Sequence, residues 1–386
     1  MLKPLIAEHV SAARRRLLHW FRANARSLPW RKSKDPYRIW VSEVMLQQTQ
    51  VDTVIPYFRR FIRAFPSIRA LAGAPLERVL ALWSGLGYYR RARYLHQAAQ
   101  RIVREHGGRF PRDWPSVRSL PGIGDYTARA ILSIAYDQPY AVLDGNAARV
   151  MARLLALGGN VRQANYRHAV ERQSQALLSR QHPGDFNQAI MEIGQSICRP
   201  REPRCPQCPL RPWCRAWHLG RPESFPAPPR RRPAETCHLA TAVMVQDRRM
   251  LLVKGLDEGL MPDLWNFPSA FGASPRQALE RLRERLTPLV NASFRLDQPA
   301  AEFRHGITYR SIIVRVYLVK TPASAPKSAL RQPYSAPARP PRAAAARWFT
   351  PDQLCRGALS QVARKALRSL EDPGRAILGQ LHSHFG

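Results

Sequence analysis

The stretch LPGIGDYTA, residues 120–128, decides the fold of the first half of this chain. Proline and two glycines, Gly122 and Gly124, make a tight turn between two helices, and glycine lets a phosphate approach the backbone closely. The helix that follows points its free N–H groups and the positive end of its dipole at such an anion. We therefore predict a helix-hairpin-helix element over about residues 117–137. A glycine-containing connector that binds nothing is the alternative.

Around this stretch, residues 1–220 show helical patterns and no strand pattern. Asp35-Pro36 offers an N-cap and a proline at the first helical position. The helix it opens, PYRIWVSEVMLQQ, is mostly apolar and is expected to be buried. Further amphipathic helices are predicted at 51–64, 76–83, 88–106, 126–136, 146–157, 164–179 and 185–197. The first half is therefore predicted to be mainly α.

The second half has a different pattern. Residues 221–236 are rich in proline and arginine, which predicts a semi-extended linker. Beyond it, HLATAVMVQ and RMLLVKG predict a hairpin, and SIIVRVYLVK (311–320) predicts another strand. PRQALERLRERL predicts a helix, and RWFTPDQL with ALSQVARKALRSL predicts a strand, a turn and a helix. We expect a smaller α+β domain over 237–386, with a disordered insertion at 321–346 that has almost nothing to bury.

The chain carries a large positive charge. Its 386 residues include 61 Lys and Arg against 27 Asp and Glu, a formal charge of +34. Such a field attracts polyanions, and DNA is the first candidate because cations that face phosphates release condensed counterions. A base-composition bias that raises arginine everywhere is an alternative partial cause, so the charge by itself indicates only a polyanionic partner.

The distribution of apolar residues and cysteines indicates where the protein works and whether it binds a metal. No apolar run reaches the roughly 18 residues of a membrane-spanning helix, and the N-terminus lacks the apolar stretch of a signal peptide. We expect a cytoplasmic monomer with no membrane partner, in which clustered cysteines indicate metal rather than disulfides. Four of the six cysteines follow Cys198-x6-Cys205-x2-Cys208-x5-Cys214. By count alone they suit either a zinc ion or a cubane iron–sulfur cluster.

Two carboxylates are candidates for catalysis. Glu43 lies mid-helix in an apolar neighbourhood, where burial would raise its pKa and let it hold a proton at neutral pH. Asp144 opens VLDGNAARVMARLL and could be an ordinary N-cap, just as Glu43 could be a buried carboxyl with a structural partner. Together they suit cleavage of an N-glycosidic bond, which needs an acid for the leaving base and a negative charge for an oxocarbenium-like sugar.

A family resemblance joins these motifs. SEVMLQQTQV (42–51), LWSGLGYYRRARYLH (82–96), LPGIGDYTA, VLDGNAARV (142–150) and the four-cysteine loop occur in the order and approximate spacing of MutY-type adenine DNA glycosylases. The resemblance covers about residues 20–220. It implies a [4Fe–4S] cluster in the loop 198–214, and a monofunctional enzyme of base excision repair. The implied substrate is double-stranded DNA with A:8-oxoguanine or A:G mispairs.

The resemblance also implies roles for individual residues. Glu43 would protonate adenine N7 and activate water, Asp144 would stabilise the oxocarbenium ion or briefly bond to it, and Tyr126 and Asn146 would assist through hydrogen bonds. Bifunctional relatives carry lysine at the position of Tyr126. Without that amine the imine route of strand cleavage lacks its nucleophile, so an abasic site is the expected product.

The target base must leave the stack to reach a buried Glu43. Gln48 and Tyr88 match the family's wedge positions, and Trp30, Arg31 and Gln188 match adenine-pocket positions. Before the resemblance is considered, Gln48 and Tyr88 could equally be core or surface residues. Gly122 and Gly124 would contact the DNA backbone.

The second domain resembles the Nudix-like domain of the same family, which reads the oxidised guanine. Its helix QALERLRERLTPL has too few carboxylates for the metal site of a working Nudix hydrolase, so a binding domain is expected. The family's F(R/K)H turn is present as Phe303-Arg304-His305, but Ile307-Thr308-Tyr309 stands where Phe-Ser-His is usual. Thr308 can still donate and accept a hydrogen bond. A strand that faces the core without a ligand is the alternative.

Three other functions remain open. An endonuclease III-like or thymine-mismatch glycosylase is one, although Tyr126 argues against the former. A non-enzymatic iron–sulfur protein that binds DNA lesions is another, disfavoured by the presence of both Glu43 and Asp144. Nucleotide hydrolysis by the second domain is the weakest because the acidic helix is missing.

Overall fold

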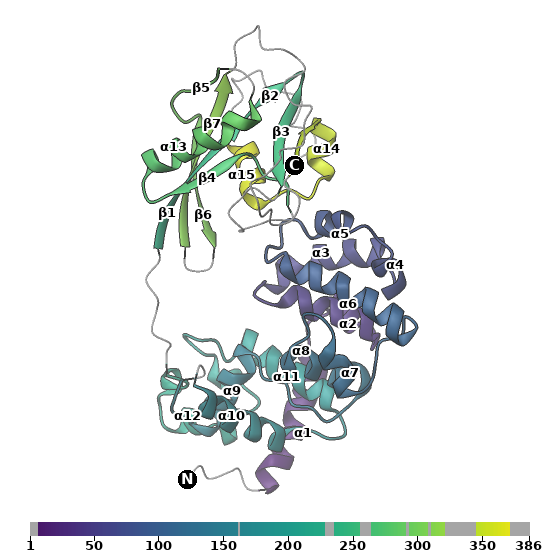
Figure 1. Ribbon diagram of the computed structural model, residues 1–386. Helices are drawn as coiled ribbons and strands as arrows, with labels where there is room; N and C mark the ends of the chain where they lie inside the picture. The colour runs from purple at the N-terminus through teal and green to yellow at the C-terminus, as the bar shows by residue number, and fades with distance from the viewer. Residues whose placement is uncertain are drawn as a thin grey trace. The chain divides into compact units, whose positions relative to one another are not determined.

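The computed structural model describes residues 7–160, 163–227, 235–254, 264–290, 293–307, 310–320 and 345–370. The chain forms two compact units (Figure 1). The first contains Met1–Ala74 and Arg90–Arg231, and the second contains Pro75–Tyr89 and Arg232–Gly386. Among the described residues, no helix combines the length and apolar character needed to cross a membrane.

The first unit consists of helices joined by short turns, so the predicted mainly α class is confirmed (Figure 1). Its α-helices are α1 (Ala7–Asn24), α2 (Pro36–Leu46), α3 (Val51–Ala64), α4 (Ile68–Ala72), α6 (Arg90–His106), α7 (Trp114–Ser119), α8 (Asp125–Tyr136), α9 (Gly145–Leu155), α10 (Ala164–Leu177), α11 (Pro183–Ser196) and α12 (Arg215–His218). Its short 3-10 helices are η1 (Pro29–Arg31), η2 (Cys205–Gln207), η3 (Arg211–Trp213) and η4 (Pro222–Ser224).

Helix α2 begins as its sequence predicts. The Asp35 side chain accepts a hydrogen bond of 2.9 Å from the backbone N–H of Tyr37, and proline occupies the first helical position. Most of the helix is buried, including Glu43. It ends at Leu46, two residues before the predicted end, because Gln47 has ψ of 113° and Gln48 adopts a left-handed φ of 58°.

The turn between α7 and α8 requires glycine for two reasons. Gly122 has a φ of +75°, which side chains rarely adopt. A Cβ atom there would also lie 2.6 Å from Cβ of Tyr94. Gly124 then caps α8 with an extended backbone, as expected for a helix whose first N–H groups are left free.

Helices α1, α9, α10 and α11 share one hydrophobic core in the first unit. Leu17 of α1, Leu154 of α9, Val170 of α10 and Ile193 of α11 are almost fully buried within it. Part of the cysteine loop packs against the same core through Cys198, Cys208 and Cys214. The cysteine loop therefore packs against α9 and α11, the helices that also position Asp144 and Gln188.

The second unit is α+β, as predicted. Its strands are β1 (Glu235–Val243), β2 (Val245–Gln246), β3 (Arg249–Lys254), β4 (Ser269–Gly272), β5 (Arg295–Leu296), β6 (Ala301–Ile307), β7 (Arg310–Lys320) and β8 (Ala345–Phe349). Its helices are α5 (Leu76–Trp83), α13 (Pro275–Leu286), η5 (Thr287–Leu289), α14 (Pro351–Arg356) and α15 (Gln361–Ser369).

The predicted hairpin of HLATAVMVQ with RMLLVKG forms only at its tip. Strand β2 pairs with β3 across a turn in which Asp247 and Arg248 have φ of 49° and 57°. The longer β1 instead pairs antiparallel with β4 and parallel with β7. Residues 239–243 of β1 are all buried, so this segment needs neighbours on both edges, which a hairpin would not supply.

Side chains of β1 and β7 alternate between two apolar layers. Leu239 and Val314 belong to one layer with α15, whereas Ala240 and Tyr317 belong to the other with α13. The sheet order is β4-β1-β7-β5, with β6 also paired to β7, and β2-β3-β8 form a second sheet. Helices therefore cover both faces of the larger sheet (Figure 1).

Segment Pro75–Tyr89 lies inside the predicted domain 1–220, yet it is grouped with the second unit. Trp265 Nε1 donates to Glu77 Oε1 over 2.9 Å, and Ser84 Oγ donates to the carbonyl oxygen of Leu359 over 2.9 Å. Helix α5 occupies the predicted residues 76–83.

The predicted disordered insertion 321–346 lies outside the described residues up to position 344. Its last two residues, Ala345 and Ala346, form part of β8 and pair with Lys254 and Val253, so the prediction of disorder is wrong for these two residues. Hydrogen bonds to β3 satisfy the backbone N–H and C=O groups of these two alanines and so order them. The alanine-rich composition gives no sign of this partner strand.

Candidate active site

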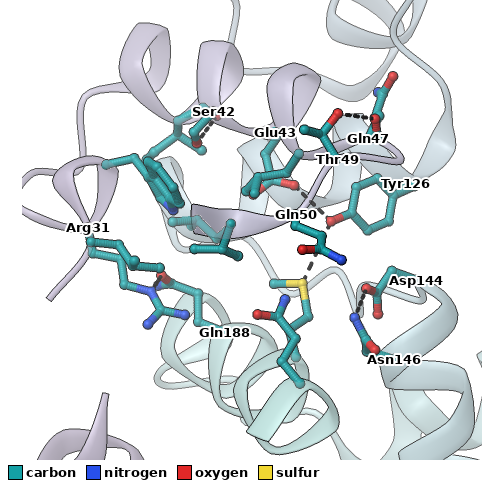
Figure 2. Close-up of a pocket in the computed structure, with 18 of the residues that line it drawn as sticks. Arg31, Ser42, Glu43, Gln47, Thr49, Gln50, Tyr126, Asp144, Asn146 and Gln188 are labelled. Carbon is teal, nitrogen blue, oxygen red and sulfur yellow. Dashed lines mark hydrogen bonds between the residues drawn. The ribbon is translucent and has the colours of Figure 1, made fainter. Parts of the chain in front are cut away.

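A cleft of about 910 Å³ lies within the first unit. Its walls come from η1, α2 and the loop after it, α8, the start of α9, and α11 (Figure 2). The cleft brings together eight of the sixteen residues that the sequence singled out: Trp30, Arg31, Glu43, Gln48, Tyr126, Asp144, Asn146 and Gln188. These residues are widely separated in the sequence, and the helix packing gathers them.

Glu43 is a buried acid in this cleft, only 5% exposed. The hydroxyl of Tyr126 donates a hydrogen bond of 2.8 Å to its Oε2 atom. Burial raises the pKa of Glu43 to about 7, with a further increase from the charge of Asp144, whereas the Tyr126 bond and the charge of Arg31 oppose it. Glu43 can therefore hold or release a proton near neutral pH.

Asp144 caps α9 and also lines the cleft. Its Oδ1 accepts from the backbone N–H of Ala147 over 2.6 Å, and its Oδ2 accepts from Asn146 Nδ2 over 3.1 Å. Burial raises the pKa of Asp144, but these two hydrogen bonds oppose that rise because they favour the carboxylate. Asp144 is thus both the N-cap of α9 and a residue of the site. Its carboxyl and that of Glu43 have different hydrogen-bond partners (Figure 2).

Tyr126 lies in the first turn of α8 and points at Glu43 (Figure 2). Its hydroxyl also lies 3.7 Å from the sulfur of Met191. Burial and the nearby carboxylates raise the pKa of Tyr126 well above its usual value, so the phenol stays neutral. It can orient the acid, but it offers no amine for an imine.

Each of the two wedge candidates adopts a strained, left-handed backbone conformation. Gln48 has a φ of 58° and Tyr88 a φ of 48°, and left-handed backbone costs a residue other than glycine about 1 kcal/mol or more. Arg91 Nη1 binds the carbonyl oxygens of Val44 and Met45 at 3.0 and 2.8 Å, and also that of Gln47, so it fixes the end of α2 next to Gln48. Tyr88 belongs to the second unit and is 46% exposed.

Two of the adenine-pocket candidates meet at α11, where Arg31 Nε donates to Gln188 Oε1 over 3.1 Å. The third, Trp30, packs edge-on against Phe58 of α3. Sequence reasoning missed four further lining or supporting residues, namely Arg26, Met191, Glu192 and Gln195. The spacing of polar and sulfur side chains along FNQAIMEIGQS was a signal for the last three, whereas Arg26 lies in no motif.

The cysteine loop is bound to α9 by two arginines. Arg153 is 2% exposed and donates to the carbonyl oxygens of Arg199 and Pro200, with its Nη1 3.4 Å from Cys198 Sγ. Arg149 donates to the carbonyl oxygen of Cys198 over 2.8 Å and to Asn146 Oδ1 over 2.9 Å. One helix thus connects the site residue Asn146 to the loop.

The four thiols fit a cationic centre by their chemistry. Burial raises the pKa of Cys208 to about 12 and that of Cys214 to about 11, and the charges of Cys198 and Cys205 add to both shifts. Thiolates gathered in this way need a cation. Among the described residues, no group of three or more His, Cys, Asp or Glu side chains is arranged to hold a single metal ion.

The predicted recognition residue Thr308 lies outside the described residues. The segment before it, Phe303–His305, belongs to β6 and pairs with β7, in register through Ile307 and Arg310. Its role therefore stays a prediction.

Comparison with known proteins defines the class. Residues 41–179 match the family described as HhH-GPD superfamily base excision DNA repair protein. A thermostable thymine-DNA glycosylase of known structure is 26% identical, with a TM-score of 0.51 over 55% of this chain and 98% of that protein. The first unit therefore has the fold of helix-hairpin-helix DNA glycosylases.

Curated relatives narrow the class to one family. The mouse adenine DNA glycosylase is 36% identical over 94% of this chain and 78% of its own length. The human adenine DNA glycosylase is 34% identical over 93% of this chain and 74% of its own length. The chain belongs to the adenine DNA glycosylase family.

Proposed function

We propose that this enzyme of base excision repair hydrolyses the N-glycosidic bond of adenine mispaired with 8-oxoguanine or guanine in duplex DNA, and leaves an abasic site. The observation that carries the proposal is the pairing of Glu43 and Tyr126 with Asp144 and Asn146 across one cleft. The cleft thus contains both an acid that titrates near neutral pH, Glu43, and a carboxylate stabilised by hydrogen bonds, Asp144.

In the proposed reaction, protonated Glu43 gives its proton to the leaving adenine, which weakens the bond to the sugar. Asp144 stabilises the positive charge that develops on the sugar, because its carboxylate is held by Ala147 and Asn146. Glu43, now ionised, takes a proton from the attacking water. Tyr126 orients Glu43 and forms no bond to the sugar.

We infer that the four cysteines hold a [4Fe–4S] cluster. When bound, it supplies a rigid, structural centre for the loop, and no step of the proposed reaction passes through it. Arg149 and Arg153 transmit that rigidity to α9. The arginines of the loop would face DNA phosphates.

A panel of duplexes tests the substrate. Single-turnover base release is measured at one defined salt concentration on A:8-oxoguanine, A:G, T:G and oxidised-pyrimidine duplexes, since binding to DNA depends steeply on salt. We expect alkali-labile abasic sites from the two adenine mispairs, loss of release in Glu43→Gln with binding retained, and no borohydride-trapped complex. Release of thymine or an oxidised pyrimidine in place of adenine would overturn the proposal.

A further inference from the structure

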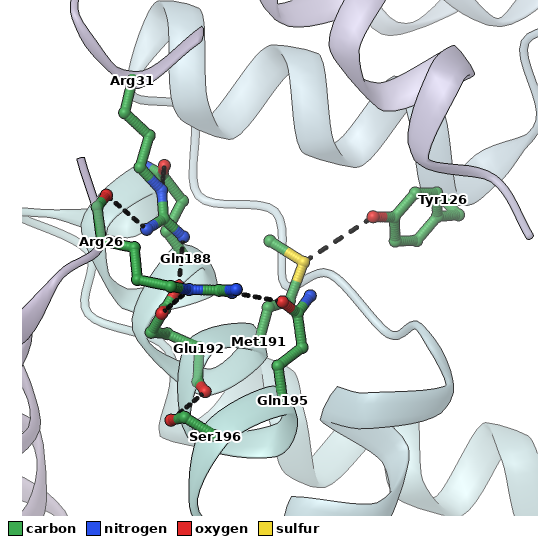
Figure 3. Close-up of polar contacts among 8 residues, drawn as sticks. All are labelled: Arg26, Arg31, Tyr126, Gln188, Met191, Glu192, Gln195 and Ser196. Atoms are coloured by element: carbon green, nitrogen blue, oxygen red, sulfur yellow. Dashed lines mark hydrogen bonds and ion pairs between the residues drawn. The ribbon is translucent and has the colours of Figure 1, made fainter. Parts of the chain in front are cut away.

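The wall of the cleft holds a buried anion that the proposed reaction does not use. Glu192 on α11 has a side chain that is 2% exposed. Arg31 Nη2 lies 2.8 Å from its Oε2, and Arg26 forms an ion pair with its Oε1 and reaches Oε2 at 3.3 Å. Figure 3 shows both guanidinium groups at this carboxyl. Such a charge is stable in the interior only when it is paired.

Three other side chains of α11 extend this contact. Gln188 accepts from Arg31, Gln195 accepts from Arg26, and Met191 contacts the Tyr126 hydroxyl (Figure 3). Together with Glu192 they have the spacing i, i+3, i+4 and i+7, which places them on one face of a helix. Helix α11 therefore fixes the two arginines and also touches the tyrosine that binds Glu43.

Arg31 has two possible effects on the chemistry. Its side chain lines the cleft in which the base would lie, but its positive charge favours the ionised form of Glu43. A cation paired with a neighbouring anion acts on a third group more weakly than a free cation does, because the two potentials partly cancel. Glu192 is placed to provide that cancellation.

Other charged and titratable groups also surround Glu43. Asp144 opposes the effect of Arg31, and the Tyr126 hydrogen bond favours the carboxylate. The remaining charged groups that line the cleft or bind the end of α2 are Arg26, Asp52 on α3, and Arg91 on α6. Arg26 is itself paired with Glu192, so a changed pH dependence in Glu192→Gln reports on Glu192 and the two arginines it holds, of which Arg31 is the one that lowers the pKa of Glu43.

We propose that Glu192 is a positioning residue: it holds Arg31 and Arg26 at the wall of the cleft and cancels the charge of Arg31, so that Arg31 can line the base pocket without drawing the proton from Glu43. This inference rests on the acid role of Glu43 proposed above. Its ion pairs, despite the opposing effect of burial, keep the pKa of Glu192 below its usual range, so Glu192 is an anion throughout the working range.

The test is the pH profile of single-turnover adenine release at saturating enzyme. The wild-type rate is expected to fall as pH rises through the titration of Glu43. In Glu192→Gln the fall should begin roughly one pH unit lower, which is roughly a tenfold loss at alkaline pH with a much smaller loss at acidic pH. An equal loss at every pH would mean that Glu192 is only structural, and would overturn the inference.

Matched variants define the cause. Asp185→Asn removes an acid from the same helix, one that lies 3.8 Å from Arg22 and is partly exposed, and it should leave the profile unchanged. Glu192→Asp keeps the charge and should keep the position of the alkaline limb even if the rate falls. A limb that moves in Asp185→Asn as far as in Glu192→Gln would contradict the proposal.

The double variant Arg31→Gln/Glu192→Gln removes both charges, and it provides a test if Glu192→Gln does not fold. Its alkaline limb should return to the wild-type position, although base binding is weaker. A limb that stays displaced to lower pH would overturn the inference. If the wild-type enzyme itself shows no alkaline limb, the acid role of Glu43 fails instead, so the two failures are distinguishable.

Discussion

At Glu43, stability and catalysis make opposite demands. The folded protein holds this carboxyl at a pKa of about 7, whereas an unfolded glutamate titrates near 4.5. The stability contributed by the protonated form is fully present below the unfolded pKa, and it is lost as pH rises toward the folded pKa. The difference is worth about 3 kcal/mol at most. A non-ionisable side chain at this position would avoid this loss of stability at higher pH.

A first prediction follows for Glu43→Gln, which keeps the shape and can still accept from Tyr126. The variant should unfold at a higher temperature than wild type at pH 8, by several degrees at most, and the two should converge below about pH 5. Thermal melts at pH 5 and pH 8 measure this. Glu171→Gln removes an acid from a surface ion pair with Arg167 and should give no comparable gain. A variant that is less stable than wild type at pH 8 would contradict the argument.

A second prediction separates the two roles of Asp144. In Asp144→Asn the side-chain oxygen can still accept from the Ala147 N–H, and asparagine caps helices as well as aspartate does. The melting temperature should change by only a few degrees, while base release falls by roughly 10²- to 10³-fold because the negative charge is gone. Asp113→Asn is the matched control, since Asp113 caps α7 in the same way. Near-normal release by Asp144→Asn would reduce Asp144 to a cap.

At the scale of elements, the crossing of α9 and α11 depends on a glycine. A Cβ at Gly194 would lie 2.6 Å from Cβ of Asn146 and 3.1 Å from its carbonyl oxygen. The two helices therefore approach each other at the residue that supports Asp144. Close packing there has both a structural and a catalytic consequence.

Gly194→Ala is a third prediction. The added methyl should push α9 away, destabilise the first unit by about 2 kcal/mol and slow base release more than the loss of stability explains. Gly158→Ala is the control: Gly158 follows the end of α9, and its Cβ would meet nothing within 4 Å. Thermal melts and single-turnover rates of both variants measure the contrast. Equal effects would show that close packing at Gly194 is not the cause.

Local signals predicted the elements better than the pairings. The Asp35-Pro36 cap and the glycine turn at Gly122 place α2 and α8 within a residue or two, because their causes lie in adjacent residues. The prediction paired β1 with β3, but its partners are β4 and β7. The residue pattern within β1 indicates a strand, and it does not indicate which strands lie beside it in the folded sheet. The end of α2 depends on Gln48, whose left-handed backbone no propensity indicates.

The site shows the same limit. Motifs identified Glu43, Tyr126 and Asp144, which the folded chain brings into one cleft. The network of Arg26 and Glu192 was missed because its partners are separated by 166 residues and no motif joins them. Contacts of this length are set by how α11 packs against the start of the chain. Sequence can suggest one face of α11, but not which arginines it meets.

At the scale of the first unit, α9 links the cleft to the cysteine loop. Its start carries Asp144 and Asn146, its middle carries Arg149, and its last turn carries Arg153. The loop contacts the core through three of its cysteines. Disorder in the loop should therefore reach the site through α9 and also through α11, which ends two residues before Cys198, although no cysteine takes part in the proposed chemistry.

Cys208→Ser is the last prediction, and it tests the cluster together with this link. If the loop is stabilised by iron, the variant should lose its iron, and its first unit should melt roughly 10 °C lower, since bound metal contributes directly to folding. Cys355→Ser changes a thiol of the second unit and should keep the iron, the melting temperature and the rate. A second transition that stays fixed in both variants would assign the loss to the first unit. Full iron content in Cys208→Ser, or a Cys355→Ser variant with the same defect, would remove the loop from this role.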